Sequence, residues 1–411
     1  MVAFSRLFLK LIILLFLLLL VLLYSYLTQN SNNISHHYRY VKLYIIRIWE
    51  DCKMSDSVQL LKQLTSANGI AGREMQVKSL MKNHLSTVSD AIIEDNLGGI
   101  FGKKSTTNGS KSILVSGHMD EVGFLVTKID KDGYLSFNPI GGWWNQVMLS
   151  QKVTVTTDDG KTLRGIIGSK PPHVLTPEER KKTVDIKNMF IDIGVSSKEE
   201  AEQLGVSVGN MVTPYSEFET LANEKYMTAK AFDNRYGCAL AIDVLNALKD
   251  ESIDINLYSG ATVQEEVGLR GAKVAAQTIQ PDLAIAVDVA VAFDTPGMSG
   301  QTSDSHLGDG PVVIMMDASS IAHEGLRQHV KDVAQQHNIE VQWDTTPGGG
   351  TDAGSIHVAN EGIPTITIGI ALRYMHSNFS VIHKDDYENS VRLVTEIVRS
   401  LNDDTYNNIK W

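Results

Sequence analysis

The stretch SILVSGHMDE, residues 112–121, is a short apolar run that ends in a cluster of polar and acidic side chains. Three further apolar runs, at residues 255–258, 283–287 and 365–370, also end in polar or small residues. Runs of this length suit buried strands of a largely parallel sheet. Helical patterns lie between them, at residues 234–249, 322–337 and 387–401. Strands that alternate with helices predict an α/β layered domain.

Residues 124–211 differ from the rest of the chain in composition and hydrophobic pattern. The segment is rich in Val, Thr and Gly, with turn signals at residues 131–133, 157–160 and 169–172. Such a pattern predicts short antiparallel strands. We therefore expect a small β domain, residues 124–211, inserted into an α/β domain made of residues 54–123 and 212–411.

Composition and charge exclude some classes of protein. The chain has 411 residues, of which 43% are apolar, so it is long enough for a real core. Its net charge is −11, and residues 1–53 are basic, so the remainder is strongly acidic and no nucleic-acid partner is expected. The two cysteines, Cys52 and Cys238, are too few for a disulfide framework or a Cys-type zinc site.

The first 53 residues form a hydrophobic extension. Residues 11–23 are all apolar, and Leu7–Leu27 would span about 30 Å as a helix, the thickness of the bilayer core. One interpretation is an uncleaved single-pass membrane anchor of unresolved orientation. The other is untranslated upstream sequence, because Met54 and the Ser and Asp residues after it are typical of a chain start and helix cap. The second interpretation predicts a cytoplasmic protein.

Polar side chains follow the predicted strands, and the carboxyl ends of parallel strands meet at one edge of a sheet. The side chains concerned are those of His118, Asp120, Asp233, Glu265, Glu266, Asp288 and His376. Imidazole and carboxylate without thiolate suit Zn²⁺, Co²⁺ or Mn²⁺, and five such ligands are enough for two ions that share a carboxylate. Glu265 and Glu266 diverge on an extended segment, so one can bind metal while the other serves as general base. Asp120, two residues after His118, can orient its ring.

These motifs resemble the M42 family of metallo-aminopeptidases, which includes glutamyl and tetrahedral aminopeptidases. Five of them occur in the family's order: GHMDEVG at 117–123, AFDNR at 231–235, VQEEVG at 263–268, VDV at 287–289 and YMHS at 374–377. The resemblance covers nearly all of the chain after residue 53. It implies that His118 and His376 are terminal ligands, one for each ion, and that Asp233 bridges the two. It further implies that Glu266 and Asp288 are the remaining ligands, Glu265 the general base and Asp120 the partner of His118.

The resemblance also implies a fold, an assembly and a substrate. The expected fold is a zinc-peptidase-like three-layer catalytic domain whose inserted β domain serves dimerisation, and family members commonly form twelve-subunit shells. A transmembrane helix on every subunit would conflict with such a shell. The loop GGGTDAG, residues 348–354, is similar to a family loop near the substrate, so Thr351 or Asp352 is expected to contact a short peptide.

For several other motifs the sequence indicates a structural role and not a catalytic or metal-binding one. His323 and His329 are six residues apart, whereas a zincin motif needs a spacing of four. Residues 383–386 are typical of a helix start, and Trp143 and Trp144 are typical of packing in the β domain or at its interface. His36 and His37 have no other ligands nearby.

Three functions remain open on the residues alone. The first is a two-metal aminopeptidase that trims short peptides. The second is a two-metal carboxypeptidase or amide deacylase, or a glycoside hydrolase of the kind labelled endoglucanase, although a glycosidase uses two carboxylates and no metal. The third is a membrane-tethered binding protein with a decayed site.

Overall fold

The computed structural model describes residues 56–298, 303–345 and 348–409. The chain divides into a unit that ends at Gln59 and a unit from Leu60 to Trp411, and the elements below belong to the second. No helix among the described residues is both long and apolar enough to cross a membrane. The hydrophobic helix predicted within residues 1–53 lies outside the described residues.

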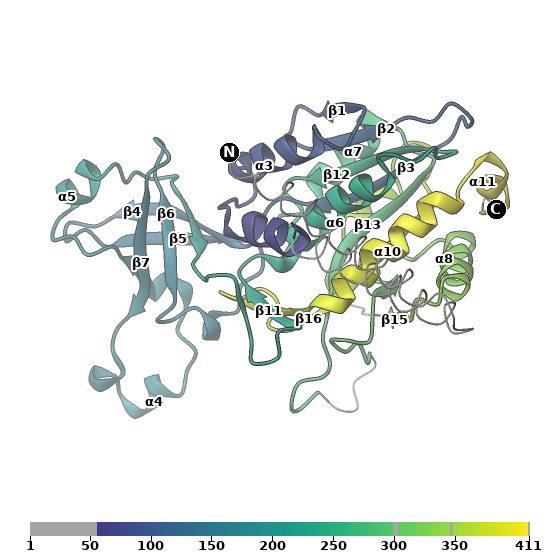
Figure 1. Ribbon diagram of the computed structural model, residues 1–411. Coiled ribbons are helices and arrows are strands. Elements are labelled where there is room, and N and C mark those ends of the chain that lie inside the picture. Colours follow the sequence, from purple (N-terminus) through teal and green to yellow (C-terminus); the bar gives the residue numbers. More distant parts are fainter. Residues whose placement is uncertain (1–55, 299–302, 346–347, 410–411) are drawn as a thin grey trace, which may run out of the picture. The chain divides into compact units, whose positions relative to one another are not determined.

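An eight-stranded sheet forms the centre of the second unit (Figure 1). Its order is β1-β2-β12-β3-β13-β16-β14-β15. The bounds are β1 Ala91–Glu94, β2 Ile100–Lys104, β12 Asn256–Thr262, β3 Ser112–His118, β13 Leu283–Val291, β16 Thr365–Leu372, β14 Val312–Met316 and β15 Gln342–Thr345. The four predicted strands are the central ones, β12, β3, β13 and β16, which pair in parallel. All eight residues of β16 are buried, as expected of a strand covered on both faces.

The four predicted strands are parallel, as is the pair of β14 and β15, but the other three pairings make the sheet mixed. Strand β2 pairs antiparallel with both β1 and β12, and β14 pairs antiparallel with β16. The first reversal has a local cause, because one carboxylate oxygen of Asp95 accepts hydrogen bonds from the N–H groups of Leu97, Gly98 and Gly99. This tight turn joins β1 to β2 as a hairpin. The α/β class itself is confirmed.

Helices cover both faces of the sheet. On one face α6 (Phe232–Leu248) packs on β3 and β12, with α3 (Met75–Leu85) and α10 (Lys384–Ser400) against it. The approach is close: a Cβ added at Gly117 of β3 would lie 2.7 Å from the backbone of Gly237 in α6. On the other face alanines of α7 (Arg270–Ile279) and Ile356 of α9 (Ala353–Ile356) pack in one cluster with Leu114 of β3.

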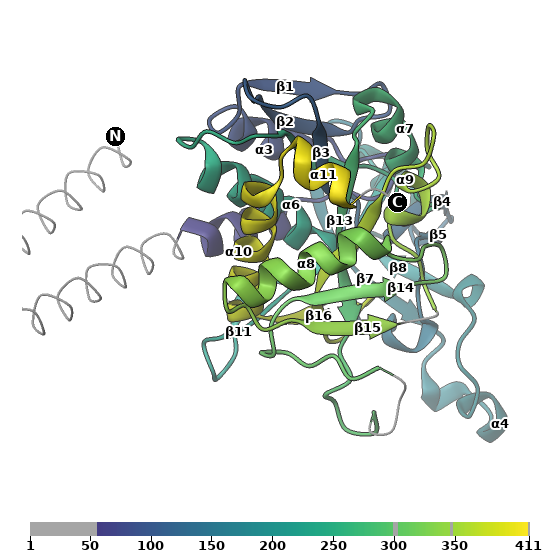
Figure 2. The same ribbon diagram turned by 90° about the vertical axis from the view of Figure 1, so that its right-hand side faces the viewer.

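Two further helices pack against each other. Helix α8 (Glu324–Gln336) contacts β16 and α10, and α11 (Asp403–Ile409) contacts α8 (Figure 2). The predicted helices at 322–337 and 387–401 correspond to α8 and α10. The start predicted at residues 383–386 is also found, with Asp385 and Asp386 in the first turn of α10, where acidic residues favour a helix.

Six strands between β3 and α6 form a closed barrel in the order β4-β5-β8-β7-β6-β9. They are β4 Gly123–Ile129, β5 Leu135–Ile140, β6 Lys152–Thr156, β7 Thr162–Ser169, β8 Met189–Asp192 and β9 Met211–Pro214. The barrel begins and ends on neighbouring strands, since Phe124 of β4 pairs with Val212 of β9. The predicted turns at 131–133 and 157–160 join β4 to β5 and β6 to β7, and each has a glycine with positive φ. Short helices α4 (Pro177–Arg180) and α5 (Lys198–Gln203) and the 3-10 turns 145–147, 172–174 and 186–188 connect other strands.

The two adjacent tryptophans have different environments: Trp143 packs in the barrel and Trp144 is exposed. Trp143 stacks on Phe124 in the barrel core, with 4.7 Å between ring centroids, and donates to the carbonyl of Gly123. Trp144 is 60% exposed. Packing in the β domain is therefore found for Trp143, whereas a place at an interface stays a prediction for Trp144.

A small three-stranded sheet brings two distant loops together. It contains β10 (Glu219–Thr220), β11 (Tyr226–Ala229) and β17 (Ser380–His383), with β11 and β17 antiparallel. Strand β11 leads to Asp233, and β17 follows the loop that carries His376. Their pairing places these two site residues next to each other.

Candidate active site

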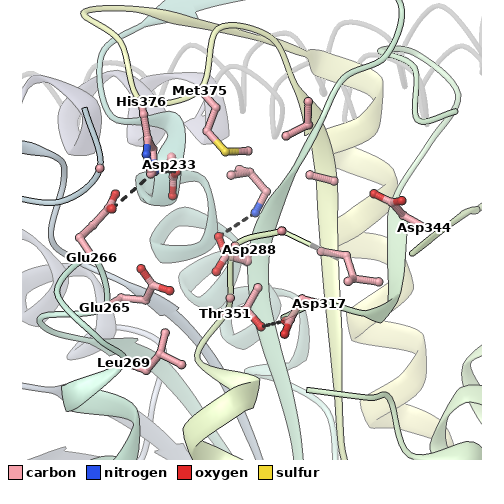
Figure 3. A pocket seen from close by; sticks show the side chains of 18 of the residues that line it. Asp233, Glu265, Glu266, Leu269, Asp288, Asp317, Asp344, Thr351, Met375 and His376 are labelled. Atoms are coloured by element: carbon pink, nitrogen blue, oxygen red, sulfur yellow. Dashed lines mark hydrogen bonds and ion pairs between the residues drawn. The ribbon is translucent and has the colours of Figure 1, made fainter. Parts of the chain in front are cut away.

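The polar side chains predicted at the strand ends converge in one place (Figure 3). His118 is the last residue of β3 and pairs in register with Thr262, the last residue of β12. Glu265 and Glu266 follow β12, Asp288 lies within β13, and His376 follows β16. The sheet order brings these segments, distant in sequence, to one edge.

Asp233 lies between the two histidines. Its Oδ1 is 3.3 Å from Nε2 of His118, and its Oδ2 is 3.4 Å from Nε2 of His376. Two groups of potential ligands result, in each of which the donor atoms lie within 4.8 Å of one another. One group is His118, Glu265 and Asp288, and the other is Asp233, Glu266 and His376.

The two glutamates face different histidines. Oε2 of Glu266 is 3.5 Å from Nε2 of His376, whereas Oε2 of Glu265 is 3.7 Å from Nε2 of His118. The side chains of Glu265 and Glu266 thus lie on opposite sides of Asp233. The predicted divergence is therefore found, although the segment is a turn, in which the carbonyl of Glu265 accepts from the N–H groups of Gly268 and Leu269.

The loops that carry these residues use unusual backbone conformations. Ala231, Gln264 and His376 all have positive φ, between 54° and 57°, which costs energy for residues other than glycine. Asp233 and Asn234 also depart from helical angles at the start of α6. The side chain of Asn234 compensates by donating to the carbonyl of Val287 and accepting from the N–H of Gly237. The predicted helix at 234–249 is therefore regular only after its first residue.

Asp120 has a different contact from the predicted one. The backbone carbonyl of Asp120 lies 3.0 Å from Nδ1 of His118, closer than its carboxylate at 3.5 Å. A carbonyl can only accept, so this contact places the ring proton on Nδ1 and leaves Nε2 free to bind metal. The carboxylate accepts instead from the N–H groups of Glu265 and Glu266, at 3.0 and 3.1 Å. Asp120 therefore orients the glutamate loop by its side chain and His118 by its backbone.

Glu74 supports the same loop and was not predicted. Its Oε1 accepts from the N–H groups of Gly72 and Gln264, at 2.7 and 3.2 Å. Burial, together with repulsion from Asp120, raises the pKa of Glu74 to about 7. No sequence signal marks this residue, because a lone Glu before a helix is typical of any helix start.

The electrostatics of the site fit cations. Burial and neighbouring carboxylates raise the pKa values of Glu265 and Asp288 well above normal, and burial and Asp233 raise that of Glu266 to about 8. Burial opposes protonation of His376, but Asp233 and Glu266 outweigh it and raise its pKa to about 9. Oε1 of Glu266 is buried without a hydrogen-bond partner among the described residues. Desolvated carboxylates so close together, with two imidazoles, suit divalent metal ions.

A cluster of buried charged side chains links the site to the segment around residues 64–69. Nζ of Lys230 lies 2.6 Å from Glu121, and the guanidinium of Arg235 lies 3.1 Å from the same carboxylate. Arg235 also donates to the carbonyl oxygens of Met119, Leu64, Ala67 and Gly69. Burial lowers the pKa of Lys230 to about 8, although Glu121 opposes the shift. The cluster ties the loop after His118 to the segment around Asp233.

Replacing Glu121 with glutamine is expected to lower the free energy of unfolding by about 3–5 kcal/mol, because it leaves two buried cations without their carboxylate. Urea denaturation followed by circular dichroism measures the change. The matched control is Glu94→Gln, which removes a more exposed carboxylate paired with Lys78 and Lys82. The control should cost less than about 1 kcal/mol. Equal losses in the two variants would refute the special role of the buried cluster.

A cavity of about 380 Å³ adjoins the two ligand groups. Its lining includes Asp233, Glu265, Glu266, Asp288 and His376 and continues to residues 348–351. Thr351 therefore lies where the prediction put a substrate contact. Asp352 does not line the cavity, because its carboxylate is buried and accepts from the hydroxyl of Thr262. Burial raises the pKa of Asp352 to about 6.

The residues to which the sequence assigned no function lie away from the two ligand groups or are buried without reactivity. His323 precedes α8 and accepts from the N–H of Leu326, and His329 contacts Ser400. Cys238 is buried, and burial raises the pKa of its thiol to about 12, so it is not a reactive cysteine. Cys52, His36 and His37 lie outside the described residues.

The mixed α/β fold and the paired histidine–carboxylate groups define a hydrolase of the metallopeptidase class. A family model described as M42 glutamyl aminopeptidase matches residues 98–393. The chain therefore belongs to the M42 peptidase family, and the predicted resemblance is confirmed.

Individual proteins agree with this assignment. A glutamyl aminopeptidase from Lactococcus lactis is 36% identical over 356 residues, which are 85% of this chain and 98% of that protein. The structure of a TET aminopeptidase from the marine sediment archaeon Thaumarchaeota archaeon SCGC AB-539-E09 has a TM-score of 0.84 and 41% identity, covering 87% of this chain and all of the other. The TET1 peptidase of Pyrococcus horikoshii, which can assemble into a tetrahedron or a large octahedral shell, has a TM-score of 0.76 and 32% identity. That match covers 84% of this chain and all of the other.

Proposed function

We propose that this protein is a two-metal aminopeptidase that removes N-terminal residues from short peptides. The observation that carries the proposal is the position of Asp233, whose two carboxylate oxygens each face a different histidine at 3.3 and 3.4 Å. A carboxylate placed in this way suits a bridge between two ions, with His118 and Asp288 on one side and Glu266 and His376 on the other. Zn²⁺ or Co²⁺ is the proposed metal, and Mn²⁺ also suits the donors.

The residues of the chain have distinct roles in the proposed reaction. Bound metal would supply Lewis-acid polarisation of the scissile carbonyl and acidify the attacking water. Glu265, which is not needed as a ligand if Asp233 is shared, takes a proton from that water as general base. It then returns the proton to the departing amine. Asp120 and Glu74 act as positioning residues, because they hold the backbone that carries Glu265 and Glu266.

The proposed architecture and assembly follow the family. Residues 54–123 and 212–411 would form a zinc-peptidase-like three-layer catalytic domain, and residues 124–211 an inserted dimerisation domain built on the barrel. The shells formed by TET1 of Pyrococcus horikoshii support a homo-oligomer, for which we propose twelve subunits built from dimers. A cytoplasmic location and the alternative membrane anchor both stay predictions, because residues 1–55 lie outside the described part of the chain.

The alternative functions make different predictions about substrate and metal. A carboxypeptidase or deacylase would not need a free α-amine, and a glycoside hydrolase would not need metal. The family assignment favours the aminopeptidase over both. All five proposed ligands and the base are competent residue types, which also argues against a binding protein with a decayed site.

Chelation of the purified full-length chain is expected to abolish hydrolysis of aminoacyl-p-nitroanilides, and Zn²⁺, Co²⁺ or Mn²⁺ should restore it. N-acetylated counterparts should not be cleaved at any stage, because the proposed site requires a free α-amine. Release of p-nitroaniline measures both effects. Cleavage of acetylated substrates would favour the deacylase, and activity that survives metal removal would refute the two-metal mechanism.

A further inference from the structure

The cavity beside the ligand groups has a second acidic region. Beyond the proposed ligands and base, its charged lining residues are Asp317 and Asp344. No lysine or arginine is among the described residues that line it. In Figure 3, Glu266 and His376 lie on one side of the cavity and Asp344 on the other, with Asp317 beside Thr351.

Neither carboxylate is at the open surface. Asp317 is 8% exposed and Asp344 is 1% exposed, so water screens their charges poorly. Oδ1 of Asp317 accepts from the N–H groups of Ser319 and Ser320, at 2.6 and 2.7 Å, and from the hydroxyl of Ser319 at 2.8 Å. Its Oδ2 accepts from the hydroxyls of Thr351 and Ser320, both at 3.0 Å. These donors are neutral, so they hold the carboxylate in place without cancelling its charge.

The path from the ligand groups to these carboxylates has apolar walls. Leu269, Val289, Val291, Ile314 and Met375 line the same cavity. Strand β14, which precedes Asp317, is two strands from β13, which carries Asp288, and each step across a sheet is about 4.8 Å. A side chain that fills this space needs a long aliphatic stem and a polar end. Lysine and arginine have this form, since their stems bury against apolar surface while their heads stay with polar groups.

We infer that this cavity binds the side chain of the N-terminal residue and selects lysine or arginine through Asp317, with Asp344 adding to the negative potential. The inference rests on the proposed aminopeptidase function and specifies its substrate. It also predicts that an N-terminal glutamate is rejected, although the matching family model is described as a glutamyl aminopeptidase. A glutamate side chain that reached past the ligand groups would meet the carboxylates of Asp317 and Asp344, with no lysine or arginine in the described lining.

The test compares p-nitroanilides of lysine, arginine, norleucine and glutamate on the metal-loaded, full-length chain. Norleucine has the same four-carbon stem as lysine without the ammonium group, so the ratio of kcat/KM for lysine over norleucine isolates the charge. We expect this ratio to be at least about tenfold, and glutamate to be cleaved at least about a hundredfold more slowly than lysine.

Two isosteric variants assign the effect to residues. Asp317→Asn keeps the acceptor for Ser319 and Ser320, and Asp344→Asn keeps an acceptor for the hydroxyl of Ser303. Each should lower the lysine-to-norleucine ratio, Asp317→Asn by about tenfold, and because both substrates are measured on the same variant, any general loss of activity cancels from the ratio. The control Asp404→Asn makes the same charge change on an exposed residue in the first turn of α11 and should leave the ratio unchanged.

The outcomes separate this inference from the proposed function. Norleucine or glutamate cleaved as well as lysine by the unmodified chain would overturn the inference and leave the aminopeptidase standing. A lysine preference that survives in both variants would overturn the assignment to Asp317 and Asp344. If no free-amine substrate is cleaved with any metal, the proposed function itself fails.

Discussion

Replacing Glu265 with glutamine is expected to reduce kcat by about 10²–10⁴-fold while metal content stays unchanged. Removal of a positioned general base typically costs this much. Glutamine has the same shape, and the N–H of residue 265 can still donate to Asp120, so the loop should keep its conformation. Steady-state kinetics and metal analysis of the same sample measure the two quantities.

The adjacent glutamate supplies the matched control. Glu266→Gln makes the same chemical change one residue away, at the carboxylate that lies 3.5 Å from His376. This variant should lose metal affinity, and excess metal should restore part of its activity. Excess metal should not rescue Glu265→Gln. If the two variants behave alike, the separate roles proposed for the adjacent glutamates are wrong.

Replacing Asp233 with alanine is expected to have the largest effect on metal binding, because the proposed bridge is a ligand that the two ions would share. Loss of an outer partner of a metal ligand already costs about 10–100-fold in affinity, and loss of a shared ligand should exceed this. Metal stoichiometry after dialysis against a defined concentration of free Zn²⁺ measures the loss. We expect the bound metal to fall well below one ion per subunit and hydrolysis to become undetectable.

Asp288→Ala is the comparison for this variant. Asp288 belongs to one ligand group only, so its loss should weaken one ion and leave the other bound. A chain with Asp233→Ala that still binds two ions with normal affinity would exclude the bridging role. Both variants need an unchanged circular dichroism spectrum for the comparison to hold.

The sequence predicted the central strands and the convergence of the polar residues for a physical reason. Strands buried on both faces are apolar at successive positions, so a polar residue after such a run marks the place where the strand leaves the core. His118 and the glutamate pair after β12 were recognisable in this way. Asp233 and His376 were also named from the residues, the first as the opening of a helix and the second after the last apolar run, and the family resemblance supplied the role of each.

Other parts of the site could not be predicted because they depend on contacts between distant residues. Glu74 reaches Gln264 across 190 residues, and Lys230 reaches Glu121 across 109. The acidic region of the cavity likewise depends on the order of β13, β16, β14 and β15, which no local pattern encodes. The antiparallel pairings of β2 and β14 were not predicted for the same reason, since strand direction is a property of pairing.

The pairing of Phe124 with Val212 has a consequence for how this architecture can diversify. The chain enters the barrel on β4 and leaves it on β9, and these two strands are paired, so the entry and the exit lie side by side as they do in a hairpin. Changes in the barrel that keep this pair, and that spare Gly141 and Gly142 beside Glu266 and His376, therefore place little strain on the strand that carries His118. We therefore expect the surface of the barrel, and with it the contacts to other subunits or proteins, to vary during evolution more easily than the residues that carry the hydrolytic chemistry.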